Sequence, residues 1–265
     1  MRTNRLFWGV LLALAGLVLL AQNFGLIDPG FWKYIGAILL ILIGVWIIVR
    51  PRLAKEELAA ETITLPLEGL TEVKVEIEHG AGRLVIGSLA TPGELLAGSF
   101  TGGLQHELDV TQQPPRLKLR PPSGSWSIPV GIGSTGLNWE MGLSREIPIH
   151  LDIKSGAGET EMDLTELQVR NLEIGTGASS THVTLPAHAG YTRVKIGAGM
   201  ASVRIRIPEG VEARVQMDTG LSSHTISPAR FTQRGDKVYE TAQYETGLNR
   251  VDIEVEAGLG SFEII

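Results

Sequence analysis

Two patterns of hydrophobic residues divide the chain. Residues 6–27 and 34–49 form two apolar runs without a charged residue. From residue 62 onward, short segments alternate apolar and polar residues, as in Val203-Arg204-Ile205-Arg206-Ile207. Long uncharged runs are typical of membrane helices, whereas alternation with a period of two is typical of strands that have one buried face and one wet face. The sequence therefore predicts a helical membrane segment followed by a mainly β domain.

The alternation is repeated, and each repeat contains glycine. Four copies lie between residues 147 and 226, and their second glycines, at 158, 177, 199 and 220, are separated by 19, 22 and 21 residues. A recurrence of about 20 residues is typical of a solenoid, in which each copy is one coil stacked on the next. Degenerate copies at 73–86 and 251–264 flank the four. We expect glycines to form the corners between strands, namely Gly82, Gly158, Gly177, Gly199, Gly220 and Gly260.

The predicted organisation has three parts. Residues 1–50 form a transmembrane helical hairpin with helices at about 6–27 and 33–49, residues 51–61 form a juxtamembrane linker, and residues 62–265 form a single-stranded β-solenoid. Regular coils are expected at 147–227, flanked by irregular coils at 62–146 and 228–265. On the first helix, small residues recur on one face, which favours close packing of the two helices or docking of another protein's helix; these residues are Gly9, Ala13 and Gly16.

Charge is distributed unevenly. Residues 1–55 carry six Lys and Arg against one acid, Asp28, and the remainder carries 17 basic and 28 acidic residues. Nearly all of these early basic residues lie before the first apolar run or after the second, rather than between the two runs. The positive-inside rule therefore predicts a multi-pass protein of the bacterial cytoplasmic membrane, with both termini and the soluble domain in the cytoplasm. An acidic domain argues against a nucleic-acid partner and leaves the lipid bilayer as the first expected partner. A cleaved signal peptide is the alternative for the first run, but a second apolar run follows at once.

The sequence contains few motifs that indicate a catalytic site. Residues 131–136 fit the dinucleotide fingerprint Gly-x-Gly-x-x-Gly, but a strand rather than a helix is expected after them. The acids Asp152, Glu159, Glu161 and Asp163 resemble the clusters of carbohydrate-active β-helices, yet alternation explains them as the wet side of a strand. The chain has no cysteine, and its six histidines lack zinc-ligand spacing. We therefore expect no catalytic, cofactor or metal site, and no enzyme.

The two halves together resemble a known family. The membrane region from Arg5 to Trp46 resembles that of LiaF-type proteins, and the soluble part resembles the toastrack β-solenoid of the same family. The resemblance rests on short stretches in a fixed order along the chain: 138–144, 147–148, 156–158 with 162–164, 207–210, Tyr244-Glu-Thr-Gly247 and Asn249-Arg-Val-Asp252. It implies a bacterial regulator of the cell-envelope stress response, whose relatives restrain a membrane sensor histidine kinase, with no catalytic residues.

Three functions remain open from the sequence. The first is a membrane-anchored, non-enzymatic regulator that binds a membrane protein such as a sensor kinase. The second is a scaffold that self-associates end to end, because an uncapped solenoid can grow by stacking into a homo-oligomer. The third is a carbohydrate-active enzyme, which would need a groove of convergent acids outside the cell. The regulator and the scaffold can be distinguished by whether other strands cover the terminal coils.

Overall fold

The computed structural model describes residues 59–89, 91–122 and 137–265, and every regular element among them is a β-strand. No helix long and apolar enough to cross a membrane occurs in these described ranges. The predicted helices at 6–27 and 33–49, with Gly9, Ala13 and Gly16, lie outside them. The strands are β1 (Ala60–Pro66), β2 (Val73–Ser88), β3 (Glu94–Thr101), β4 (Gln105–Asp109), β5 (Arg116–Arg120), β6 (Leu137–Leu143), β7 (Ile149–Asp163), β8 (Val169–Thr184), β9 (Tyr191–Arg206), β10 (Val211–Ile226), β11 (Phe231–Gly235), β12 (Val238–Thr241) and β13 (Asn249–Ile264).

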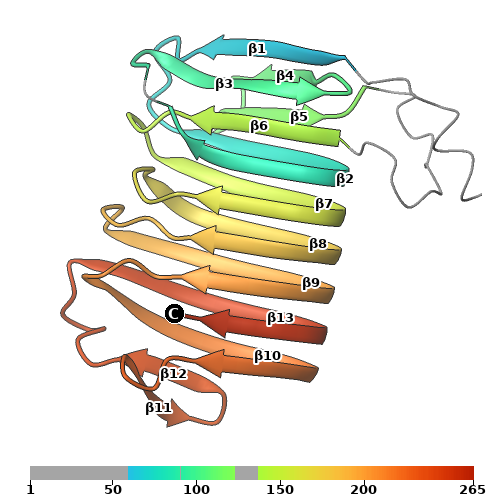
Figure 1. Ribbon diagram of the computed structural model, residues 1–265. Coiled ribbons are helices and arrows are strands. Elements are labelled where there is room, and N and C mark those ends of the chain that lie inside the picture. The colour runs from blue at the N-terminus through green and yellow to red at the C-terminus, as the bar shows by residue number, and fades with distance from the viewer. Residues whose placement is uncertain (1–58, 90, 123–136) are drawn as a thin grey trace, which may run out of the picture. The chain divides into compact units, whose positions relative to one another are not determined.

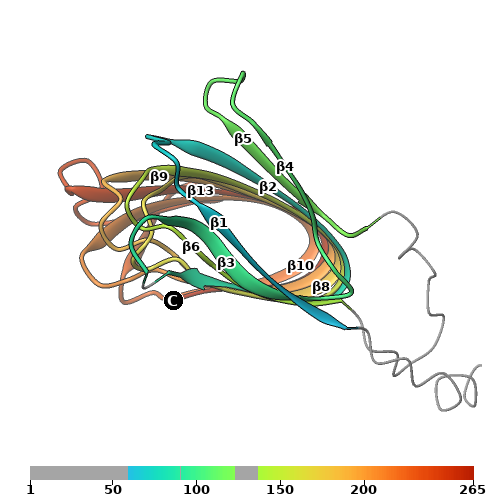
Figure 2. The same ribbon diagram turned by 90° about the horizontal axis from the view of Figure 1, so that it is seen from above.

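The long strands stack in parallel to form the solenoid (Figure 1). Their order is β2-β7-β8-β9-β13-β10, and each pairs with its neighbours along nearly its whole length. Each strand bends near its middle, so that its two halves lie on opposite walls of a flattened tube (Figure 2). The expected mainly β, toastrack-like solenoid is therefore the fold of the described residues.

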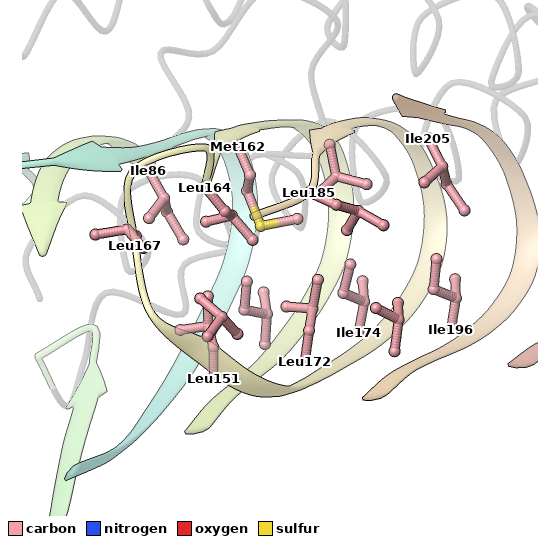
Figure 3. Close-up of a cluster of buried hydrophobic side chains, with 14 of the residues drawn as sticks. Ile86, Leu151, Met162, Leu164, Leu167, Leu172, Ile174, Leu185, Ile196 and Ile205 are labelled. Carbon is pink, nitrogen blue, oxygen red and sulfur yellow. The ribbon is translucent and has the colours of Figure 1, made fainter. Parts of the chain in front are cut away.

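Apolar side chains fill the tube in ladders. On one wall, Val75, Leu151, Leu172, Val194, Ile253 and Val215 lie opposite one another in successive strands. From the other wall, Met162, Leu185 and Ile205 point back toward Leu172 and Ile196 (Figure 3). These core side chains are almost completely buried. Because each coil exposes its apolar row until a neighbour covers it, stacking supplies the main stabilisation of the fold.

The last strand, β13, does not lie at the end of the stack. A coil at 228–265 that flanked the regular coils would lie there. β13 lies between β9 and β10, in the interior of the sheet. Charge explains the insertion: Asp252 of β13 lies opposite Arg193 of β9 on one side and Arg214 of β10 on the other. Direct pairing of β9 with β10 in this register would place the two arginines opposite each other, which destabilises a sheet. The acids of β13 instead pair with β9, as Lys195–Glu256 (3.1 Å) and Arg204–Glu263 (2.6 Å) show.

Shorter strands cover one end of the stack and a small part of the other. At one end, β5 pairs with the first half of β2 and β6 with its second half, and β3 and β1 extend the sheet beyond β6. At the other end, β12 pairs with residues 214–216 of β10, and β11 pairs with β12. β4 and β5 pair with each other as an antiparallel hairpin.

The glycine corners are in a different register from the one inferred from spacing. Gly177 stacks on Gly156, not on Gly158. The two backbones are so close that a Cβ on Gly177 would lie 2.6 Å from the Gly156 carbonyl oxygen. Gly158 lies opposite Ser179 instead. The first repeat interval is therefore 21 residues, from 156 to 177, and the column continues through Gly199, Gly258 and Gly220.

Candidate functional site

A shallow groove of about 330 Å³ crosses the outer surface of β9, β13 and β10. Its lining residues come from the first halves of these strands, and the insertion of β13 brings them together. The alternation of each strand sends one set of side chains into the core and the other into the groove. The groove-facing polar residues are Arg193, Arg214, Gln216, Asp252 and Glu254.

Asp252 is the centre of the groove. The hydroxyl of Tyr191 donates a hydrogen bond to one carboxylate oxygen at 2.6 Å, and the hydroxyl of Tyr244 donates to the other. The hydrogen bond to Asp252, with burial, raises the pKa of Tyr191, and burial together with the same carboxylate raises the pKa of Tyr244 well above its usual range. Both phenols therefore stay protonated at neutral pH and act as donors. Tyr244 thus attaches the loop before β13 to that strand, and Tyr191 attaches β9 to it.

Arg214 closes the other side of the groove. Its guanidinium lies 4.2 Å from the centre of the Tyr244 ring, in cation–π geometry. It also donates to Glu240 at 2.6 Å and to Glu245 at 2.9 Å. The hydrogen bond to Glu240 raises the pKa of Arg214. These contacts join β10, β12 and the loop before β13, so they stabilise the end of the solenoid.

The groove is suited to binding, and nothing in its geometry resembles a nucleophile with its base. Asp252 is paired with Tyr191 and Tyr244, and Arg214 with Glu240 and Glu245, whereas Arg193 and Glu254 are exposed on neighbouring strands. A partner that carries both acidic and basic groups could pair with these two charges. Among the described residues, no three His, Asp or Glu side chains converge in a way that could hold a metal ion.

The four acids considered from the sequence do not form one cluster. Asp152 precedes the corner of β7 and lies 3.6 Å from Lys74. Glu159 and Glu161 follow the corner, on the opposite wall, and both contact Arg83. Asp163 caps the next turn by accepting from the backbone N–H and the hydroxyl of Thr165. Each acid thus has a structural partner, and the fingerprint at 131–136 lies outside the described residues.

The corner glycines fall into two classes. Gly82, Gly158 and Gly260 have φ values of +140°, +137° and +149°, a region that L side chains rarely adopt. The others, Gly177, Gly199 and Gly220, have no such φ, but a Cβ on each would lie 2.6, 3.2 and 3.0 Å from a carbonyl oxygen of the adjacent coil. Close backbone approach is common to both classes.

Sequence reasoning did not single out the groove residues. Arg193 of β9, Arg214 of β10 and Asp252 of β13 belong to three repeats, and they meet only because β13 lies between β9 and β10. One signal was available: Tyr244-Glu-Thr-Gly247 and Asn249-Arg-Val-Asp252 were among the stretches that resemble the toastrack family. They now have a physical role, because Asn249 accepts from the Gly190 N–H at 3.1 Å while Tyr244 donates to Asp252.

Comparison with known proteins agrees with this architecture. The model of the N-terminal domain of toast_rack (DUF2154) matches residues 54–206, and the model of the LiaF transmembrane domain matches residues 1–55. No curated protein matches the chain.

Two solved structures are similar. A candidate cell adhesion protein from Clostridium sporogenes superposes with a TM-score of 0.70 at 20% identity, over 78% of this chain and 98% of its own. A candidate adhesin from Bacteroides fragilis gives a TM-score of 0.28 at 6% identity, over 78% and 97%. The first likeness supports the fold alone. Since the toast_rack model covers more than half of the chain and the LiaF model covers its beginning, the chain belongs to the toast_rack family and is a LiaF-type membrane protein.

Proposed function

We propose that this protein is a non-enzymatic regulator of the bacterial cell-envelope stress response that binds and modulates a membrane sensor histidine kinase. The observation that carries the proposal is the LiaF transmembrane match at residues 1–55, joined directly to a toast_rack solenoid. The first part attaches the protein to the membrane that a sensor kinase spans. The second part offers a rigid, charged surface for a protein partner.

The outer groove is the proposed contact surface for that partner. Arg193 and Glu254 are exposed on adjacent strands that the core ladders hold rigid. Because the backbone that carries these opposite charges is already ordered, binding costs little backbone conformational entropy, and the charges favour a partner of complementary charge.

The β2 end of the stack is covered, which argues against end-to-end growth on that side. The outer side of β2 is paired along both halves by β5 and β6, whereas at the other end β12 pairs with only residues 214–216 of β10. Covered strands offer few free backbone groups for another copy to extend the sheet. The dispersed acids of β7 likewise give no support to the carbohydrate-active alternative.

We place the solenoid in the cytoplasm, on the charge distribution of residues 1–55. Because the chain lacks cysteine, a single Gln233→Cys substitution in the exposed turn of β11 reports its side of the membrane. The thiol is expected to resist a membrane-impermeant reagent in intact cells and to react after permeabilisation. Ready labelling in intact cells would place the solenoid outside and remove the kinase's cytoplasmic part as its partner.

A deletion strain tests the function itself. Loss of the gene is expected to raise the output of an envelope-stress reporter, because the kinase is released. Full-length protein is expected to restore low output in proportion to its amount, since binding depends on stoichiometry. Neither residues 1–60 nor 62–265 alone is expected to restore it fully. Complete rescue by trace amounts of one half would indicate turnover and defeat the binding mechanism.

A further inference from the structure

The bent corners of the solenoid carry a row of exposed apolar residues. Ala157, Ala178, Met200 and Leu259 occupy equivalent positions in β7, β8, β9 and β13, each opposite the next. We call these four residues the corner row. Met200 is 63% exposed and Leu259 is 43% exposed. Two large apolar side chains thus lie side by side in water at the outermost point of adjacent coils.

The surroundings of Met200 and Leu259 are free of charge. The bends of β8, β9, β13 and β10, at the matching residues 176–181, 198–203, 257–262 and 219–224, contain no Asp, Glu, Lys or Arg, whereas the bend of β7 carries Glu159. Elsewhere the outer surface of the same strands is charged, with ion pairs such as Lys195–Glu256 and Arg204–Glu263 on either side of the bends. A charge-free band with projecting Met and Leu side chains is the composition that enters a lipid interface at the lowest cost in desolvation.

The chain joins the solenoid on this same edge. Ala60, at the beginning of β1, pairs with Thr101; the neighbouring Phe100 pairs with Trp139 of β6. β6 begins at Leu137, which lies opposite Gly82 at the corner of β2. Figures 1 and 2 show β1 beginning on the side where the long strands bend. The first strand of the solenoid therefore begins at the corner edge rather than at the loop edge, and the match to the LiaF transmembrane domain ends five residues before it, at residue 55.

We propose that the corner edge of the solenoid lies on the lipid bilayer, with Met200 and Leu259 inserted among the lipid headgroups and the upper acyl chains. The occupant of the corner row is lipid, because the first described strand begins at this edge, five residues after the match to the LiaF transmembrane domain ends, and because the band offers no charge for a protein partner to match. The outer groove, before the bends, stays in water. The proposal concerns the surface on which the solenoid rests and holds whether or not the partner is a kinase.

The test uses the full-length protein in vesicles of phosphatidylethanolamine and phosphatidylglycerol. An environment-sensitive fluorophore is attached to a single cysteine at Met200→Cys or Leu259→Cys, in a chain that has no other cysteine. Leu248→Cys is the matched control. It is also an exposed apolar residue, 92% exposed, but it precedes β13 and is about 30 Å of strand away from the corner at 3.3 Å per residue.

Emission from positions 200 and 259 is expected to shift to shorter wavelength, and lipids with a nitroxide near the headgroup are expected to quench it several-fold more than emission from position 248. Adding Met200→Glu to the Leu259→Cys protein is expected to abolish most of that difference, whereas Leu248→Glu leaves it intact. Equal, weak quenching at all three positions would overturn the proposal. So would a shift that persists in detergent and depends on protein concentration, because it would identify a second copy as the occupant. Quenching unchanged by Met200→Glu would also contradict it.

Discussion

Gly158 shows how one residue fixes the path of a coil. Its φ is +137°, and a Cβ in that place would lie 1.9 Å from the carbonyl oxygen of Gly82 in the coil below. No rotation of a side chain relieves this contact, because both partners are backbone. Gly197, by comparison, has an ordinary φ and would meet only the Ile174 oxygen at 3.9 Å.

Gly158→Ala is therefore expected to destabilise the protein strongly. A residue forced into this φ region costs about 1–3 kcal/mol, and the backbone clash adds to it. The melting temperature shifts by about 2–4 °C per kcal/mol for a domain of this size, so the melting temperature of the detergent-purified protein should fall by at least several degrees. Gly197→Ala, the matched control, should change it little. A Gly158→Ala protein as stable as wild type would show that the corner is misplaced.

His79 is a buried titratable residue at the corner of β2. It is 3% exposed, its Nε2 donates to the Leu137 carbonyl oxygen at 3.1 Å, and its ring packs edge-on against Trp139. Burial lowers the pKa of His79 from its ordinary value of 6.5. The folded protein therefore holds the neutral ring, and the unfolded chain binds the proton more tightly.

Stability is consequently expected to fall as the pH drops below about 6.5, where the unfolded chain takes up this proton. The melting temperature of wild type should decrease between pH 7 and pH 5, before the carboxylates titrate. His79→Gln should be less stable at pH 7 but should lose less over the same range. Parallel pH profiles for the two proteins would exclude His79 as the cause.

At the scale of elements, the insertion of β13 is the feature that sequence periodicity could not supply. The repeats with glycines at 158, 177, 199 and 220 predict the coils, because each one carries the same buried alternation, although the stacked glycine of the first coil is Gly156 rather than Gly158. Periodicity contains no information on which coil neighbours which, however. That information lies in cross-strand charge: Asp252 between Arg193 and Arg214, and Glu263 beside Arg204. The groove was not predicted for the same reason, since its residues meet only in this strand order.

The bond between Tyr244 and Asp252 is expected to hold β13 in place. Tyr244→Phe removes one of two donors to a carboxylate, at a cost of about 1.5–3 kcal/mol for a hydrogen bond to a charged group. The pKa of Tyr244 is raised, so the folded state favours the protonated phenol, and its stabilisation is lost as the pH rises above the ordinary value of 10.0. Melting curves between pH 8 and pH 11 should show a steeper loss for wild type than for Tyr244→Phe.

Tyr239→Phe is the control for this substitution. The Tyr239 hydroxyl lies 3.4 Å from His224 Nε2, at the limit of a hydrogen bond. Its removal should leave both the melting temperature and the alkaline slope close to those of wild type. An equal loss in the two variants would mean that Tyr244 has no special part in attaching β13.

At the scale of the whole molecule, a segment that matches the LiaF transmembrane domain precedes a β-solenoid. The family assignment accounts for attachment to the membrane, and the core ladders account for a rigid surface. Arg193 and Arg206 lie on the same strand, β9, before and after its bend, so they are exposed on opposite walls. They provide a matched pair for locating the partner.

The most direct test of the proposed function is cross-linking in living cells. A photo-reactive amino acid replaces Arg193 or Arg206 in the full-length protein, and adducts are identified by mass spectrometry. Position 193 is expected to yield an adduct with a membrane sensor histidine kinase, and position 206 is expected to yield none. Adducts at position 193 that contain only another copy of this chain, or a kinase adduct equally strong at position 206, would contradict the account.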